Sequence, residues 1–161
     1  MRRREKEITD INEVNRILGS TQYITVAMSK QNRPYLVTLS HGFDSERNCL
    51  YFHCASSGKK VDILTCNPRI WGQAVVDRGY AEGYCDHLYE SVHFQGRVMF
   101  IKSIAEKTHA LKIMIRQLEK NPDQVIESQL NEAAIKKVSI GRIDIQKVYG
   151  KRSEKVIIST P

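Results

Sequence analysis

The spacing of apolar residues changes along the chain, and each change predicts a new element. Apolar residues recur every three or four positions after Asp10, which can cap a helix, so a short helix is predicted up to Gly19. β-branched and aromatic residues then come in short runs separated by turn-forming residues, and such runs are typical of strands. Five strands are predicted before the next long helix, at residues 23–28, 35–40, 49–53, 69–77 and 89–101.

Helices are expected between and after these strands. A short helix is predicted at residues 59–64, and it must end before Pro68 because proline disfavours helical geometry in the residue that precedes it. Ser103 begins a second capping box, and Pro122 stands at the first position of a further helix. A last strand is predicted at residues 138–148.

The order of these elements favours one architecture. A doubly wound sheet needs strands and helices that alternate, whereas most of these strands follow one another through short turns. We therefore expect a mainly β fold with flanking α-helices, as a closed or nearly closed antiparallel barrel with the helices outside. The length of 161 residues fits a single domain over residues 1–161, with a basic tail from about residue 150.

Charge narrows the choice of partners. The chain has 25 Lys and Arg against 18 Asp and Glu, a net charge of +7, and a basic surface attracts nucleic acid, acidic lipid or phosphorylated small molecules. We find no nucleic-acid-binding module, so a nucleic-acid partner is not expected. No apolar run approaches the roughly 18 residues of a membrane span, and no secretory signal follows the N-terminal arginines. We expect a cytoplasmic protein without a membrane partner.

Metal and redox motifs are not evident. The four cysteines are Cys49, Cys54, Cys66 and Cys85. They contain no C-x-x-C pair, which argues against a zinc ribbon or a thioredoxin-type site, and we expect reduced thiols. Cys85, His87 and Glu90 could form a mixed cluster, but we predict no metal site. Neither G-x-S-x-G nor G-x-G-x-x-G occurs, so a serine hydrolase and a Rossmann nicotinamide site lack support.

The strongest local signal for chemistry is the loop between the third strand and the short helix. It reads His53-Cys54-Ala55-Ser56-Ser57-Gly58-Lys59-Lys60. Small residues let backbone amides approach an anion, a helix N-terminus offers unpaired N–H donors, and the two lysines add positive charge. The loop suits a phosphate dianion, and it equally suits an ordinary polar loop that caps a helix.

A second signal is an alternating row in the fifth strand. Alternation sends Tyr89, Ser91 and His93 to one face of the sheet and the intervening residues to the other. Buried hydroxyls need hydrogen-bond partners, so a polar row against a barrel wall suggests a bound ligand. A solvent-facing row is the simpler alternative.

Taken in order, these segments resemble the pyridoxamine-5′-phosphate-oxidase-like flavoproteins with the FMN-binding split barrel, and most closely the branch that includes nitroimidazole-resistance proteins. The resemblance spans about residues 5–152. The segments that carry it are residues 34–40, 50–53, 58–62, 67–69, 89–92 with Gly96, 106–107 with 110–111, and 150–151.

The resemblance implies a homodimer with FMN in a groove at the subunit interface. The residues that it assigns to the cofactor are Thr38, Leu39, Ser40, His53, Ser56, Ser57, Gly58, Lys59, Lys60, Tyr89 and Ser91. The two lysines and the small-residue loop would hold the FMN phosphate. The backbone of residues 38–40 would bond the polar edge of the isoalloxazine ring. His53 would lie near the flavin, and Tyr89 and Ser91 would line its ribityl or ring side.

The implied function is a flavin-dependent oxidoreductase that reduces a small electrophile, such as a nitroaromatic or a quinone. The alternative is a non-catalytic protein that binds FMN or haem. The candidate axial ligands of a haem are His41, His53, His87 and His93. Two positions depart from the family's usual residues: Thr38 stands where proline is common, and Trp71 stands where a smaller residue is common.

Overall fold

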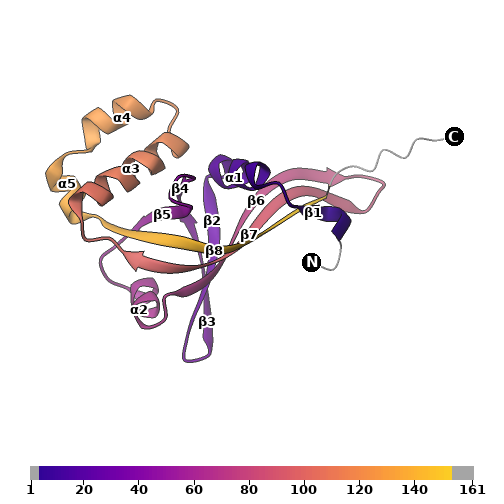
Figure 1. Ribbon diagram of the computed structural model, residues 1–161, viewed down its shortest axis with the longest axis horizontal. Helices are drawn as coiled ribbons and strands as arrows, with labels where there is room; N and C mark the ends of the chain where they lie inside the picture. The colour runs from indigo at the N-terminus through magenta and orange to yellow at the C-terminus, as the bar shows by residue number, and fades with distance from the viewer. Residues whose placement is uncertain (1–3, 154–161) are drawn as a thin grey trace.

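The computed structural model describes residues 4–153, and its ribbon is drawn in Figure 1. Its elements in chain order are a 3-10 turn at Arg4–Lys6, β1 (Glu7–Ile8), α1 (Ile11–Ser20), β2 (Tyr23–Lys30), β3 (Arg33–Ser40), β4 (Gly42–Asp44), β5 (Cys49–Cys54), α2 (Lys59–Cys66), β6 (Arg69–Ala81), β7 (Asp86–Phe100), α3 (Ile104–Leu118), α4 (Pro122–Gln129), α5 (Glu132–Lys137) and β8 (Ser139–Ser153).

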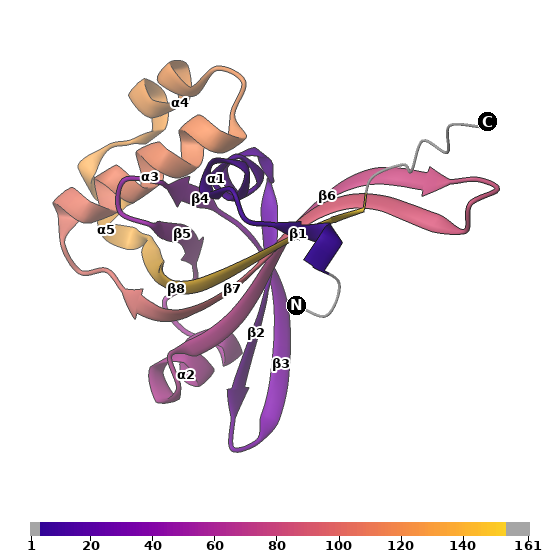
Figure 2. The ribbon, with the colours of Figure 1, turned by 45° about the vertical axis from the view of Figure 1, so that its right-hand side comes forward.

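The strands form one antiparallel sheet that curls into a split barrel. Their order is β3-β2-β6-β7-β8-β5-β4, with β1 paired to β8. The sheet curls back on itself, so that β3 contacts β5 from the far side of this order. Beyond the barrel, β6 and β7 continue as a two-stranded arm, with the end of β8 beside it (Figure 2). The expected mainly β split barrel with flanking helices is confirmed.

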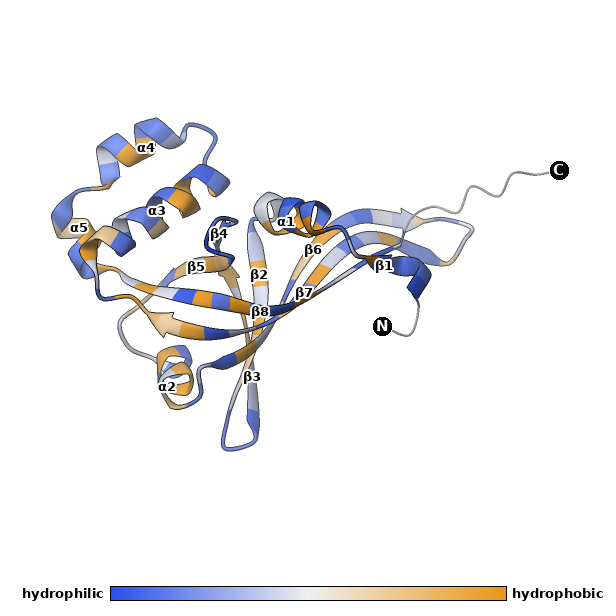
Figure 3. Cartoon of the chain, in the orientation of Figure 1, coloured by the Kyte–Doolittle hydropathy of each residue, from blue (hydrophilic) through white to orange (hydrophobic). Residues whose placement is uncertain are grey.

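Alternation along the strands fills the barrel. Ile24, Val26 and Met28 of β2 are buried at every second position, and the rings of Phe52 and Phe94 meet them in the main core. Glycines make room for both rings: a Cβ at Gly72 would overlap Phe94, and a Cβ at Gly141 would overlap Phe52. In Figure 3 the ribbon of β8 alternates between apolar and polar residues, as expected for a strand with two different faces.

A second, smaller core lies on the other side of β5. There Cys49 and Tyr51 are fully buried under Ala110 and Met114 of α3. Strand β5 is therefore buried on both faces, with the barrel on one side and the helices on the other. This arrangement decides where the residue after Phe52 points, because neighbouring side chains leave a strand on opposite faces.

Both predicted helix caps are confirmed. The Asp10 side chain accepts a hydrogen bond from the Asn12 amide at 2.9 Å, and the Ser103 hydroxyl accepts one from the Glu106 amide at 3.4 Å. Pro122 begins α4 as predicted. The helical region has one element more than predicted, because Asn131 caps a separate short helix, α5, through the Ala134 amide.

The strands are longer than the sequence pattern indicated. Strand β6 continues to Ala81, and strand β7 already begins at Asp86. In this polar arm the backbone is extended because the two strands pair with each other, not because apolar side chains alternate. The basic tail was expected to begin near residue 150, but Lys151 to Ser153 still pair with β7. The rest of that tail, including a segment at residues 156–158 that could add to a sheet edge, lies outside the described residues. None of the helices at residues 4–153 is long and apolar enough to cross a bilayer.

Candidate functional site

The loop after β5 leads into a helix whose N-cap residue offers no capping side chain. Gly58 occupies the N-cap position with φ of 121°, a conformation that favours glycine. Within residues 4–153 no side chain caps the first amides of α2, so these N–H groups keep their hydrogen-bonding capacity. Ile63 and Leu64 anchor the helix in the main core. The helix N-terminus is therefore fixed in place with donors to spare.

Two lysines stand at this N-terminus, each over an aromatic ring. The Lys59 ammonium lies 4.5 Å from the centroid of the Tyr35 ring on β3, and the Lys60 ammonium lies 5.4 Å from that of Phe52. Within residues 4–153 neither lysine forms an ion pair. Cation–π contacts orient an ammonium without neutralising it, so both charges remain available to an anion.

These groups surround a pocket of about 250 Å³ between β3, β5 and α2. Its lining includes Tyr35, Cys54, Ser57, Gly58, Lys59 and Lys60. Four of the residues expected at a phosphate are thus brought together. Ser56 is exposed beside them but does not line this pocket. Tyr35 is a member of the site that sequence reasoning missed, and only its cross-barrel contact with Lys59 reveals it.

The three predicted residues of β3 lie at the edge of the sheet. Strand β3 ends the strand order, and among residues 4–153 it pairs only with β2, so one side of its backbone has no ladder partner in the described chain. The side chains of Thr38 and Ser40 are exposed, and that of Leu39 is buried in the core. Backbone groups at this edge can bond a planar ligand, as the resemblance implies.

His53 is not brought into the lysine pocket. Because Phe52 points into the barrel, His53 points toward the helices, where it lines a separate cavity of about 290 Å³ with apolar residues of α3 and α4. The sequence could not place it, since residues 49–52 are buried on both faces and give no contrast between them.

Tyr89 and Ser91 do not line the lysine pocket of their own chain. Their strand, β7, is separated from β3 by β2 and β6, and from β5 by β8. Ser91 is 2% exposed, and its hydroxyl donates to the Lys151 carbonyl at 3.3 Å. At Ser91, therefore, the simpler alternative of a row of side chains that face solvent does not hold. The Lys151 ammonium lies 5.6 Å from the Tyr89 ring centroid. Burial, and then the charge of Lys151, lower the pKa of His93 in the same row.

The outer face of this sheet carries large exposed side chains. They are Tyr23, Leu36, Trp71, Val75 and Tyr149. The Trp71 and Tyr149 rings are stacked, with 5.9 Å between centroids and 1° between planes. Strand register connects this face to β3: Thr38 lies opposite Thr25, which lies opposite Gln73. An apolar face of this kind is typical of a surface that something else covers.

The candidate haem ligands are scattered. His41 is fully buried, and its Nε2 lies 3.0 Å from the Leu18 carbonyl. His87 bonds Asp77 at 2.9 Å on the arm.

Cys49 is buried, which raises the pKa of its thiol to about 11 and makes it a poor nucleophile. Residues 4–153 contain no group of three or more His, Cys, Asp or Glu placed to hold a metal ion.

Solved structures share this fold. A candidate 5-nitroimidazole antibiotic resistance protein from Bacteroides thetaiotaomicron is 22% identical, with a TM-score of 0.76 over 92% of this chain and 90% of its own. A flavocytochrome from Azotobacter vinelandii is 18% identical, with a TM-score of 0.81 over 96% and 72%. An FAD- and haem-binding protein from Mycobacterium smegmatis is 15% identical, with a TM-score of 0.77 over 93% and 74%.

A comparison with curated protein sequences gives no match. The sequence profile of one family does match, and it covers residues 10–152, nearly the whole described chain. That match includes the lysine loop, the edge strand β3 and the long strands of the arm. The chain therefore belongs to the pyridoxamine 5′-phosphate oxidase family.

Proposed function

We propose that the protein binds a flavin through the phosphate of its FMN moiety and acts as a flavin-dependent oxidoreductase. The observation that carries this proposal is the pocket at α2, where Lys59 and Lys60 face an open space without a carboxylate partner at residues 4–153. A phosphate dianion would supply the missing negative charge. Family membership and solved neighbours named as flavin-binding proteins support the same cofactor.

Each part of the site has a separate role. The two lysines, the Ser57 hydroxyl and the first amides of α2 would hold the phosphate. The free edge of β3 would bond the polar edge of the isoalloxazine ring. When bound, the flavin supplies the electron transfer, and the protein supplies position and electrostatics. No side chain is required as an acid or base, so a small electrophile such as a nitroaromatic or a quinone is the proposed substrate.

The proposal includes a homodimer with the flavin at its interface. The outer face, with Trp71 and Tyr149 stacked on it, is a large apolar surface that a second copy would cover. Tyr89 and Ser91 belong to the same sheet, but two strands, β2 and β6, separate their strand from β3. Across such an interface, these residues of one copy would approach the flavin held by the other.

The visible absorption spectrum of the purified protein tests the cofactor. We expect a two-band flavin spectrum, and denaturation should release a flavin that chromatography identifies. An intense Soret band would instead support the haem alternative. That alternative is suggested by two solved neighbours, a flavocytochrome and an FAD- and haem-binding protein. A colourless protein that takes up no added flavin would contradict the proposal.

A further inference from the structure

A further pocket opens on the outer face of the sheet. It has a volume of about 490 Å³ and lies between the start of β6 and the ends of β2 and β3 that flank their turn. Its lining includes Ser29, Pro34, Arg69, Trp71 and Gln95. None of these residues lines the pocket at α2, so a ligand bound here would not occupy the phosphate site.

One wall of this pocket is an indole ring that is held in place. Trp71 is 45% exposed, and the Tyr149 ring stacks on it with 1° between the planes. Tyr149 does not line the pocket. On the other side, Ala27 lies opposite Trp71 across β2 and β6, and its side chain is too small to cover the indole. A flat aromatic ligand can therefore stack on the part of the indole that Tyr149 leaves open.

The pocket carries an unbalanced positive charge. Arg69 is exposed in it, no carboxylate lines it, and within residues 4–153 the Arg69 guanidinium forms no ion pair. Arg97 lies directly opposite Arg69 across β6 and β7. Asp144 is next in this row, but Arg142 already donates to it at 2.7 Å. Like charges that face each other across a strand pair are destabilising, and a bound anion would relieve the repulsion.

The two groups are held at a fixed separation. The Asn67 amide nitrogen donates to the Ser29 carbonyl at 3.0 Å, and its oxygen accepts from the Arg69 backbone amide at 3.3 Å. The start of β6 is thereby fastened to β2 across the pocket. Arg69 and Trp71 leave the same face of β6, roughly 7 Å apart along the strand, which the long arginine side chain can span.

We propose that this pocket is a second ligand site, separate from the flavin site, that binds a planar aromatic carboxylate. The aromatic ring would stack on Trp71, and the Arg69 guanidinium would bind the carboxylate through two parallel N–H···O bonds. Gln95 adds a side-chain amide to the lining. The proposed dimer interface continues the other way along this face, toward Val75 and Tyr149, so Trp71 stands at the boundary of the two surfaces.

Isothermal titration with three matched probes tests this site. The first, 4-nitrobenzoate, has a planar ring and a charge; 4-nitrobenzamide has the ring alone, and cyclohexanecarboxylate has the charge alone. We expect 4-nitrobenzoate to bind at least about tenfold more tightly than either of the others, the range of a charged hydrogen bond. It should also quench the fluorescence of Trp71, the one tryptophan of the chain, in a saturable way with the same Kd.

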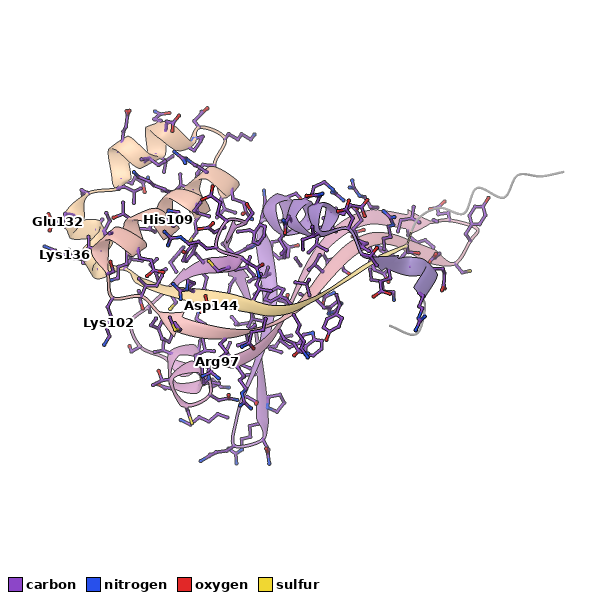
Figure 4. All side chains as sticks on the ribbon, viewed as in Figure 1. Arg97, Lys102, His109, Glu132, Lys136 and Asp144 are labelled. Carbon is purple, nitrogen blue, oxygen red and sulfur yellow. The ribbon has the colours of Figure 1, made fainter. Side chains whose placement is uncertain are left out.

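Two variants locate the binding of the charge. Arg69→Gln should lower the affinity for 4-nitrobenzoate to that for 4-nitrobenzamide, whose own affinity should not change. Arg97→Gln is the matched control, because it removes the same charge from the opposite position on the same face without touching the pocket lining (Figure 4). We expect it to change the affinity by less than about twofold, since exposed charges act weakly through solvent. Thermal unfolding checks that both variants remain folded.

The possible outcomes are distinct. Equal affinity for the three probes would overturn the site, and so would equal losses in the two variants, because general attraction to a basic surface would then explain the binding. Competition between 4-nitrobenzoate and FMN, or loss of 4-nitrobenzoate binding in Lys59→Ala, would overturn it too, because the probe would then occupy the flavin pocket. Tight binding of 4-nitrobenzoate by a protein that takes up no flavin would support this site and refute the proposed function.

Discussion

On one side of β5 the charged side chains form ion pairs, and on the other side two lysines form none within residues 4–153. On the helix side, Arg142 donates to Asp144 at 2.7 Å and to Glu106 at 2.5 Å, and His109 bonds the buried Asp44 at 2.6 Å. Figure 4 shows His109 and Asp144 on this side, toward α3. On the α2 side, Lys59 and Lys60 form no ion pair within residues 4–153.

Under the proposed function, this difference separates charges that stabilise the fold from charges that would bind a ligand. Satisfied groups fasten α3 to the sheet, and their loss should lower stability without changing ligand affinity. Unsatisfied groups contribute little to folding, and their loss should lower ligand affinity without changing stability. Under the proposed dimer, the stacked Trp71 and Tyr149 belong with the second kind, because a second copy would cover their exposed surface. For each residue below, we predict whether its loss changes the stability of the protein or its affinity for a partner or ligand.

The largest effect is expected for Lys59→Ala. Loss of a charged hydrogen bond to the phosphate should weaken flavin binding by about 1.5–3 kcal/mol, or roughly ten- to hundredfold in Kd. The free energy of unfolding without flavin should fall by no more than about 1 kcal/mol, the value of an exposed cation–π contact such as the one with Tyr35. Flavin titration and urea unfolding measure the two quantities. Lys102→Ala removes an exposed lysine elsewhere and should change neither; an unchanged flavin affinity in Lys59→Ala would sink the phosphate assignment.

Trp71→Ala should weaken self-association. Removal of a large aromatic anchor from an interface costs about 2 kcal/mol or more, so the dimer Kd should rise roughly thirtyfold. Sedimentation velocity over a range of concentrations measures it. The control is Tyr84→Ala, which removes an aromatic residue of similar exposure from the tip of the arm. A protein that is monomeric before the substitution would refute the predicted interface.

Arg142→Ala should show the reverse behaviour. Two carboxylates lose their shared partner, and since Arg142 is partly exposed we expect a loss of about 1–2 kcal/mol in the free energy of unfolding. Urea unfolding measures this loss, and flavin affinity should be unchanged. Lys136→Ala breaks an exposed pair with Glu132 and should cost much less. Equal costs for the two variants would show that the Arg142 pairs are not structural.

The smallest effect concerns acid stability at Asp44. Burial alone would raise its pKa, but hydrogen bonds from His109 and from the Arg47 amide lower the pKa overall. A lowered folded-state pKa stabilises the protein above the unfolded value of about 3.9, and this contribution is lost as the pH falls below it. The free energy of unfolding, measured from pH 6 to pH 3, should fall less steeply for Asp44→Asn than for the unaltered protein. Parallel curves would show that Asp44 does not contribute.

Much of the fold follows from local sequence rules. The caps at Asp10 and Ser103, the hairpin of β2 and β3, and the helix before Pro68 all depend on residues close together in the chain. Strands β1 and β4, with two and three residues, are too short to show a period. The arm was underestimated because its extended backbone is sustained by pairing between polar strands rather than by burial.

The candidate site was predictable only where it is local. The loop before α2 can be recognised in the sequence by its small residues and by two lysines in succession. The side of the sheet that His53 faces could not be predicted. Its strand is buried on both faces, so the sequence shows that side chains alternate but not which of them point into the barrel. The neighbour that completes the pocket, Tyr35, comes from β3 at the far end of the strand order. Only the curling of the sheet brings it to α2.

The most direct test of the central claim compares FMN with riboflavin, which has the same ring and ribityl chain but no phosphate. If the unpaired lysines at α2 hold the phosphate, FMN should bind at least about tenfold more tightly than riboflavin at low salt, and added salt should narrow the gap. Isothermal titration of the flavin-free protein with each compound gives the ratio. Equal affinities would contradict the account, because the charges at α2 would then have no part in binding the cofactor.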